Sequence, residues 1–88
     1  MVSETLQILN EKGLHARAAA AFVRSANAFA ADVTVEKDGQ KVSGHSILGL
    51  MMLGAACGTS ITITCFGEQE NEALAALAKL VKDKFNEN

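Results

Sequence analysis

The 88-residue chain contains no proline, tryptophan or tyrosine, and its only aromatic side chains are four phenylalanines. Proteins that bind single-stranded nucleic acid stack bases on aromatic side chains, and this sequence offers little for that kind of recognition. Clusters of cations are lacking too, because the eight lysine and arginine residues are dispersed and the formal net charge is −2. Both absences argue against a nucleic-acid-binding protein.

The chain also lacks the signals of export and membrane insertion. Its first residues contain no basic region followed by an apolar run, and no stretch approaches the roughly 18 apolar residues of a membrane span. The two cysteines, Cys57 and Cys65, lack a CxxC spacing, and one possible bridge is a poor match to a disulfide-rich secreted domain. We therefore expect reduced thiols and a cytoplasmic protein with no inserted segment.

The hydrophobic pattern predicts a small α+β protein. With 88 residues and 49% hydrophobic content, residues 1–88 are expected to form a single domain with a modest core. Apolar residues alternate as in strands over 2–9, 32–36, 41–43 and 60–66, and they recur at helical spacing over 16–29, 47–53 and 73–85. Asp38-Gly39 predicts a tight type I′ hairpin. The order β-α-β-β-α-β-α favours one antiparallel sheet with helices on one face.

The segment around His15 carries the clearest chemical signal. His15 follows a glycine turn and lies where an alanine-rich amphipathic helix begins. A helix N-terminus offers unpaired N–H groups and a positive dipole, so a phosphoryl group on His15 would be held without a metal. Arg17 can pair with phosphoryl oxygens, and a neutral imidazole is a nucleophile. The alternative is that His15 only caps the helix.

No other spacing in the chain indicates a catalytic or metal site. His45 is expected to be a solvated loop residue, and no further residues are spaced to complete a metal site with the two histidines. We therefore expect no metal and no cofactor. The acids near the start of the last helix, Glu68, Glu70 and Glu72, are interpreted as a solvated face.

The second informative segment begins at Ser46, which is a good N-cap for a short helix that ends near Gly54. Leu50 and Leu53 can face the core, but so short a helix cannot bury every side. The remaining apolar side chains are therefore expected to form an exposed patch suited to several partners. They are Ile47, Leu48, Met51 and Met52.

These two segments resemble a known family. The runs 13–17, before an alanine helix, and 46–54 are similar to the signature segments of HPr, the histidine-containing phosphocarriers of the bacterial phosphoenolpyruvate-dependent phosphotransferase system. The similarity covers essentially the whole chain. It implies an open-faced β-sandwich, in which four antiparallel strands are covered by three helices on one side. It also implies a monomeric carrier, not an enzyme.

The resemblance also implies partners and roles. His15 would be phosphorylated transiently at Nδ1, the pros nitrogen, by Enzyme I and would pass the phosphoryl group to Enzyme IIA proteins, with Arg17 steadying it. Ser46 would be the target of an ATP-dependent HPr kinase. The patch formed by Ile47, Leu48, Met51 and Met52 would dock Enzyme I and the IIA proteins.

Ala18 departs from the family pattern, because most members of the sugar branch have proline at this position. Alanine is compatible with a first helical turn, so the fold is unaffected. The branch stays open: a nitrogen-related or regulatory paralogue would act as a binding module that responds to phosphorylation. A third possibility, a ferredoxin-like ligand-binding domain, would require a pocket between sheet and helices.

Overall fold

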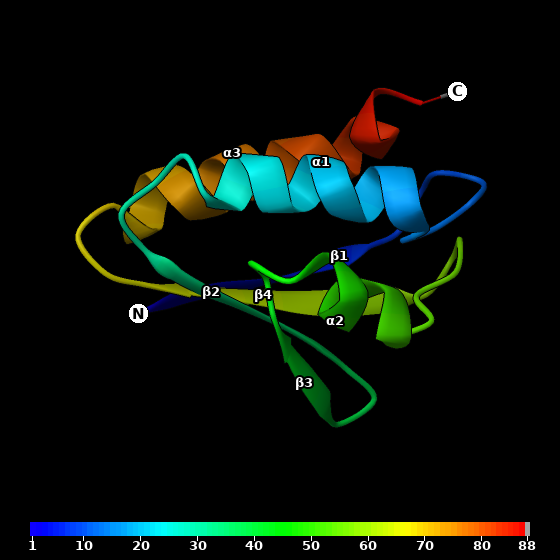
Figure 1. Ribbon diagram of the computed structural model, residues 1–88, viewed down its shortest axis with the longest axis horizontal. Helices are drawn as coiled ribbons and strands as arrows, with labels where there is room; N and C mark the ends of the chain where they lie inside the picture. The colour runs from blue at the N-terminus through cyan, green and yellow to red at the C-terminus, as the bar shows by residue number, and fades with distance from the viewer. Residues whose placement is uncertain (88) are drawn as a thin grey trace.

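The computed structural model describes residues 1–87. Its elements are β1 (Val2–Gln7), α1 (Ala16–Ala26), β2 (Asp32–Lys37), β3 (Gln40–Ser43), α2 (Ile47–Met52), β4 (Ser60–Phe66) and α3 (Glu70–Lys82), followed by a short turn, η1 (Lys84–Asn86) (Figure 1). The predicted order of strands and helices is confirmed. None of the helices in the described part of the chain is long and apolar enough to cross a membrane.

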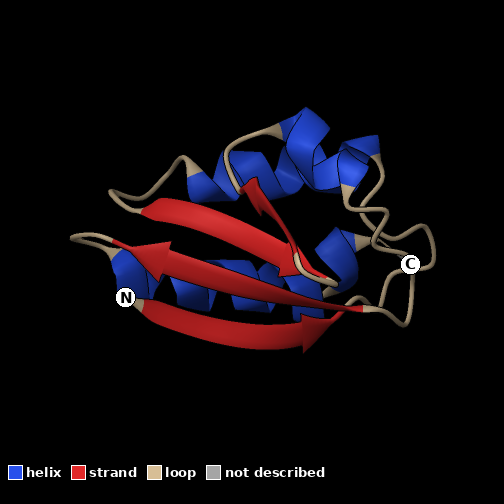
Figure 2. Cartoon of the chain, turned by 90° about the horizontal axis from the view of Figure 1, so that it is seen from below, coloured by secondary structure: helices blue, strands red, loops and turns tan. Residues whose placement is uncertain are grey.

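The strands form one antiparallel sheet in the order β1-β4-β2-β3. Seen from below, the sheet lies in front of the helices (Figure 2). The helices therefore cover the face that points away from the viewer, and the face towards the viewer is open. The open face carries hydroxyl groups that bond across strands: Ser3 Oγ lies 2.8 Å from Thr64 Oγ1, and Thr5 Oγ1 lies 2.9 Å from Thr62 Oγ1. The prediction of an open-faced β-sandwich is confirmed.

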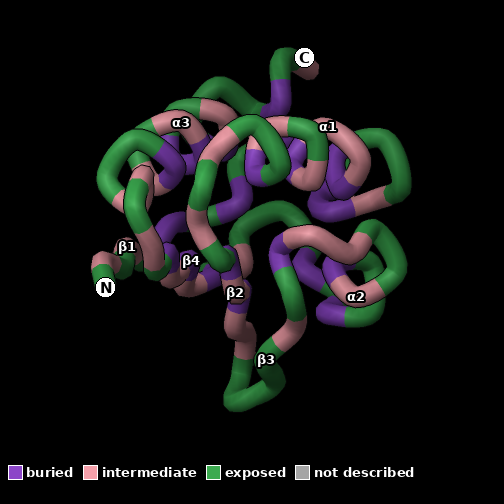
Figure 3. The backbone as a smooth tube through the Cα atoms, turned by 60° about the vertical axis from the view of Figure 1, so that its left-hand side comes forward, coloured by how far each residue is buried: buried purple, intermediate pink, exposed green. Residues whose placement is uncertain are grey.

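The core lies between the covered face of the sheet and helices α1 and α3 (Figure 3). Alternate strand residues point into it, because successive side chains in a strand face opposite ways. The largest fully buried hydrophobic side chains are Ile8, Phe22, Val33, Val35, Leu50, Ile61, Ile63, Cys65, Leu77 and Val81. Small side chains on α1, including Ala18 and Ala19, are also fully buried, which lets this helix approach its neighbours closely.

The hairpin between β2 and β3 has the predicted turn. Asp38 and Gly39 have φ of 52° and 83°, the left-handed values that a type I′ turn requires at both positions. The loop that follows β3 differs from expectation, because His45 is half-buried and hydrogen-bonded through both ring nitrogens. Its Nε2 accepts from the Val33 N–H at 3.2 Å, and its Nδ1 therefore donates to Asn27 Oδ1 at 2.7 Å. His45 thus ties the end of α1 to the start of β2.

The last helix also differs from expectation at both ends. Glu70 is not simply a solvated acid: its carboxylate accepts from the Gly67 N–H at 3.1 Å and from the N-terminal amine at 2.9 Å. The extension of this helix to Phe85 was wrong, because α3 ends at Lys82 and φ is 57°, 55° and 61° at Lys84, Phe85 and Asn86. The chain therefore turns sharply while Phe85 stays buried.

Candidate functional site

The glycine turn before α1 positions His15. Gly13 has φ of +66°, and a Cβ at this position would lie 2.3 Å from the carbonyl oxygen of Ala55. Only glycine therefore lets the loop pack this closely against the chain after α2. The Leu14 N–H then donates to the same carbonyl at 2.9 Å, and the Leu14 side chain is buried. These contacts fix the entry of the chain into α1.

His15 is the N-cap residue of α1, with extended backbone angles, and its side chain makes no capping hydrogen bond. The first helical bond runs from the Ala19 N–H to the His15 carbonyl at 2.8 Å. The N–H groups of Ala16, Arg17 and Ala18 therefore have no acceptor within residues 1–87. Unpaired donors and the helix dipole at this end of α1 suit the binding of an anion.

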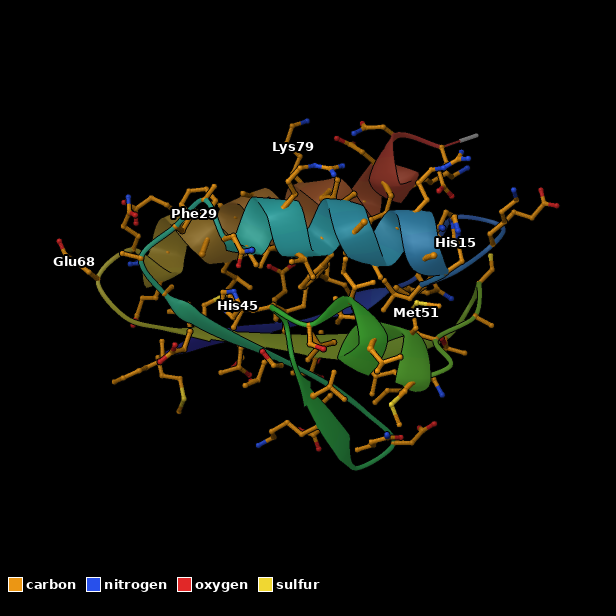
Figure 4. The ribbon with its side chains drawn as sticks, in the orientation of Figure 1. His15, Phe29, His45, Met51, Glu68 and Lys79 are labelled. Carbon is orange, nitrogen blue, oxygen red and sulfur yellow. The ribbon has the colours of Figure 1, made fainter. Side chains whose placement is uncertain are left out.

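The C-terminal segment reaches the histidine. His15 Nε2 lies 2.7 Å from Glu87 Oε2, and the side chains of these two residues are 27% and 16% exposed. Asn10, which is fully buried, donates from Nδ2 to Glu87 Oε1 at 3.1 Å and to the Gly13 carbonyl at 2.8 Å. No pattern in the sequence indicates Glu87 or Asn10 as part of the site. Figure 4 shows His15 at the end of the molecule to which the C-terminal segment returns.

The hydrogen bonds of Glu87 settle which atom of His15 is free. The bond to His15, above all, holds the pKa of the Glu87 carboxyl below its usual range, and the bond from Asn10 and the charge of Arg17 add to this. An ionised carboxylate only accepts hydrogen bonds, so His15 Nε2 carries the hydrogen. In the neutral ring the lone pair then lies on Nδ1, which has no hydrogen-bond partner within the described residues. Nδ1 is therefore the nitrogen that can act as a nucleophile.

The Arg17 side chain is exposed, and its guanidinium makes no hydrogen bond or ion pair with any residue from 1 to 87. It lines a surface cavity of about 410 Å³ together with residues from the loop before α1 and from the C-terminal segment: Glu11, Lys12, Phe85, Asn86 and Glu87. His15 borders a second cavity, of about 190 Å³, beside Gly54–Ala56. The structure thus brings the guanidinium to the same end of the molecule as the free nitrogen of His15.

No group of three or more metal-ligating side chains occurs within residues 1–87. The cysteines differ in surroundings: Cys65 is buried in the core, whereas Cys57 is exposed.

The helix after Ser46 has the predicted form. Ser46 Oγ accepts from the Gly49 N–H at 3.0 Å, so this serine is the N-cap of α2. Leu50 and Leu53 are buried, and the predicted exposed patch is present, with exposed fractions of 42% for Ile47, 69% for Leu48, 42% for Met51 and 64% for Met52. α2 packs against α1, and Met51 lies at the same end of the molecule as His15 (Figure 4).

The fold agrees with the comparisons with known proteins. A family model described as "PTS HPr component phosphorylation site" matches residues 2–83. The chain therefore belongs to the HPr family of the phosphotransferase system, whose members are phosphocarriers and not enzymes.

Relatives at high coverage support the same assignment. The chain is 46% identical over 84 residues to the HPr-like protein Crh of Bacillus subtilis, covering 96% of this chain and 99% of that protein. It is 44% identical over 87 residues to the phosphocarrier protein HPr of Neisseria meningitidis, covering 99% and 98%. The crystal structure of an HPr from Thermoanaerobacter tengcongensis superposes with a TM-score of 0.96 at 43% identity, covering 100% of this chain and 99% of the other.

Proposed function

We propose that His15 accepts a phosphoryl group at Nδ1 from the phosphohistidine of Enzyme I and passes it to Enzyme IIA proteins. The observation that carries this proposal is the free Nδ1 at the N-terminus of α1, in a ring whose Nε2 is already occupied by Glu87. Membership of the HPr family supports a carrier role in the phosphotransferase system. In this proposal residues 1–88 act as one carrier domain that is loaded by one cytoplasmic partner and unloaded by another.

The chemistry needs only positioning and charge stabilisation. Attacking and leaving nitrogens must lie in line with phosphorus, and negative charge on the three phosphoryl oxygens must be balanced. The unpaired N–H groups of Ala16, Arg17 and Ala18 and the uncommitted guanidinium of Arg17 are the donors for those oxygens. No metal is required for this exchange between two nitrogen nucleophiles.

The exposed patch of Ile47, Leu48, Met51 and Met52 is proposed as the surface that docks Enzyme I and the IIA proteins. Exposed apolar clusters mark interaction sites, and methionine side chains adapt to several partners.

We propose that the carrier works as a monomer. A solved HPr from Thermoanaerobacter tengcongensis is a dimer, so light scattering after size-exclusion chromatography is the test; a stable dimer would contradict the monomer.

Ser46 is proposed as a regulatory phosphorylation site for an HPr kinase/phosphorylase. A phosphate adds about two negative charges at neutral pH, and the N-terminus of a helix is a favourable place for them. Since Ser46 already caps α2, the added phosphate need not unfold this helix. Its effect would fall on the adjoining docking patch, where it would repel an acidic partner.

The second candidate is a regulatory or nitrogen-related paralogue that binds partners according to its phosphorylation state. It is favoured by the 46% identity to the HPr-like protein Crh. Ala18 does not decide between the branches, since its methyl group is buried and its N–H lies in the first turn. Phosphoryl transfer from His15 to IIA proteins distinguishes the carrier from the binding module, because a binding module would not need to transfer the phosphoryl group.

The test is incubation with phosphoenolpyruvate and Enzyme I, followed by intact-mass measurement before and after mild acid. We expect one acid-labile phosphate in the wild type and in the control His45→Gln, and none in His15→Ala, because phosphohistidine is the acid-labile species. The phosphorylated wild type should then phosphorylate a IIA protein. If the wild type takes up no phosphate from an Enzyme I of the same cell, the carrier function is wrong.

A further inference from the structure

We propose that Glu87 is a positioning residue that keeps the hydrogen of the His15 ring on Nε2 and so makes Nδ1 the nitrogen that receives the phosphoryl group. This inference rests on the proposed function and deepens it. The contact itself is short, 2.7 Å between Nε2 and Oε2, and both groups are largely shielded from solvent. A free histidine exchanges its hydrogen between the two nitrogens, whereas a ring bonded to a carboxylate keeps it on one.

The carboxylate is oriented as well as close. Asn10 Nδ2 donates to Oε1 while Nε2 uses Oε2, so each oxygen of Glu87 has a defined partner. Asn10 is fully buried and is also bonded to the Gly13 carbonyl, in the turn that leads into His15. The acid and the histidine are therefore held by the same loop. A nucleophile oriented by a second group that is in turn held by a third is the arrangement expected at a reactive side chain.

The backbone after α3 is built to deliver Glu87. Three consecutive residues other than glycine, Lys84 to Asn86, have left-handed φ values, which side chains disfavour. The turn persists because Phe85 is buried in the core and the Asn86 N–H bonds the Asp83 carbonyl at 2.9 Å. A helix continued past Lys82 would carry residue 87 along its own axis. The turn instead redirects the chain towards the start of α1.

The position of Glu87 also suits the charge changes of the transfer. When the Nδ1 lone pair attacks phosphorus, the bond from phosphorus to the donor nitrogen breaks and its electron pair returns to the donor ring. His15 keeps its hydrogen on Nε2 and gains a positive charge, which lies next to the Glu87 carboxylate. When the phosphoryl group leaves, the electrons of the P–Nδ1 bond return to His15. No proton has to leave or enter the ring during loading and unloading.

The experiment compares wild type, Glu87→Ala and Glu11→Ala in the full chain. Glu11 is a matched control because it is an exposed acid on the same surface cavity and makes no hydrogen bond within residues 1–87. Two-bond ¹H–¹⁵N spectra report which nitrogen of His15 carries the hydrogen, and single-turnover mixing with phosphorylated Enzyme I gives the transfer rate. Thermal melting checks that each variant is folded.

We expect the Nε2–H form in wild type and in Glu11→Ala, and a mixture of both forms in Glu87→Ala. The transfer rate should fall about tenfold or more in Glu87→Ala alone, which is the typical loss for a hydrogen bond to a charged group. A wild-type ring pattern or a wild-type rate in folded Glu87→Ala would overturn the inference, as would an equal loss in Glu11→Ala. Failure of the wild type to accept phosphate would instead overturn the proposed function.

Discussion

At the scale of single residues, the two cysteines show how far the fold changes one side chain's chemistry. Cys65 lies in β4 with no exposed surface, and burial, helped by the nearby Glu70 carboxylate, raises the pKa of its thiol. Cys57 lies in the turn before β4 and is exposed. The thiolate is the reactive form, so these surroundings separate the two residues in reactivity.

This contrast predicts selective labelling. A maleimide added to the folded protein at neutral pH should modify one thiol per chain, at Cys57, and a second only after denaturation. The Cys57→Ser variant should then remain unlabelled while folded. Intact-mass spectrometry over time measures both reactions. Rapid labelling of folded Cys57→Ser would mean that Cys65 is accessible, and would contradict the burial on which the prediction depends.

The two histidines make a related point about what a sequence conveys. Both histidines follow a glycine closely and lie near the start of a helix. The helical pattern after His15 correctly placed this residue at a helix N-terminus. The role of His45 could not be read in the same way. Its partners, the Val33 N–H and Asn27 Oδ1, come from separate elements that only the folded chain brings together.

At the scale of elements, α2 combines a structural cap with the proposed regulatory site. The helix has only six residues, so the bond from the Gly49 N–H to Ser46 Oγ is a large part of what defines its start. An N-cap serine replaced by alanine typically costs about 1 kcal/mol. The same oxygen is the proposed phosphate acceptor, so one substitution tests both roles.

Ser46→Ala should therefore lower the free energy of unfolding by about 1 kcal/mol. It should also abolish an acid-stable phosphate formed with ATP and an extract that contains the kinase. Urea titration measures the first effect and intact mass the second. Ser60→Ala is the control, since that serine is exposed in β4 and its hydroxyl makes no hydrogen bond within residues 1–87. Equal phosphorylation of Ser46→Ala and wild type would exclude Ser46 as the site.

The turn η1 marks the limit of prediction for the elements. Alternating and helical periodicities located all four strands and three helices, because burial of one face is a local property of the sequence. The end of α3 had no such signal. Phe85 continued the helical spacing of apolar residues, and none of Lys84, Phe85 and Asn86 is the glycine that usually marks a left-handed helix end. Glu87, 72 residues from His15 in the sequence, could therefore not be placed beside it.

At the scale of the whole molecule, the features proposed for function gather at one end. His15, the turn after α3 and the exposed side of α2 lie there, whereas Phe29 and Glu68 lie at the other end (Figure 4). A partner that reaches His15 would therefore also cover α2. Phe66, an exposed apolar side chain outside α2, is only two residues from Glu68 and is 61% exposed.

This separation allows the docking patch to be tested with a matched pair of variants. Leu48→Ser and Phe66→Ser each remove one exposed apolar side chain, 69% and 61% exposed, so neither should disturb the core. If partners bind over α2, Leu48→Ser should raise KM for phosphorylation by Enzyme I about fivefold or more with kcat little changed, since central apolar contacts dominate binding energy. Phe66→Ser should leave both constants near the wild-type values. Steady-state kinetics at varied carrier concentration measures both. An equal KM for the two variants would place the docking surface elsewhere, because a partner seated on α2 must lose its contact with Leu48.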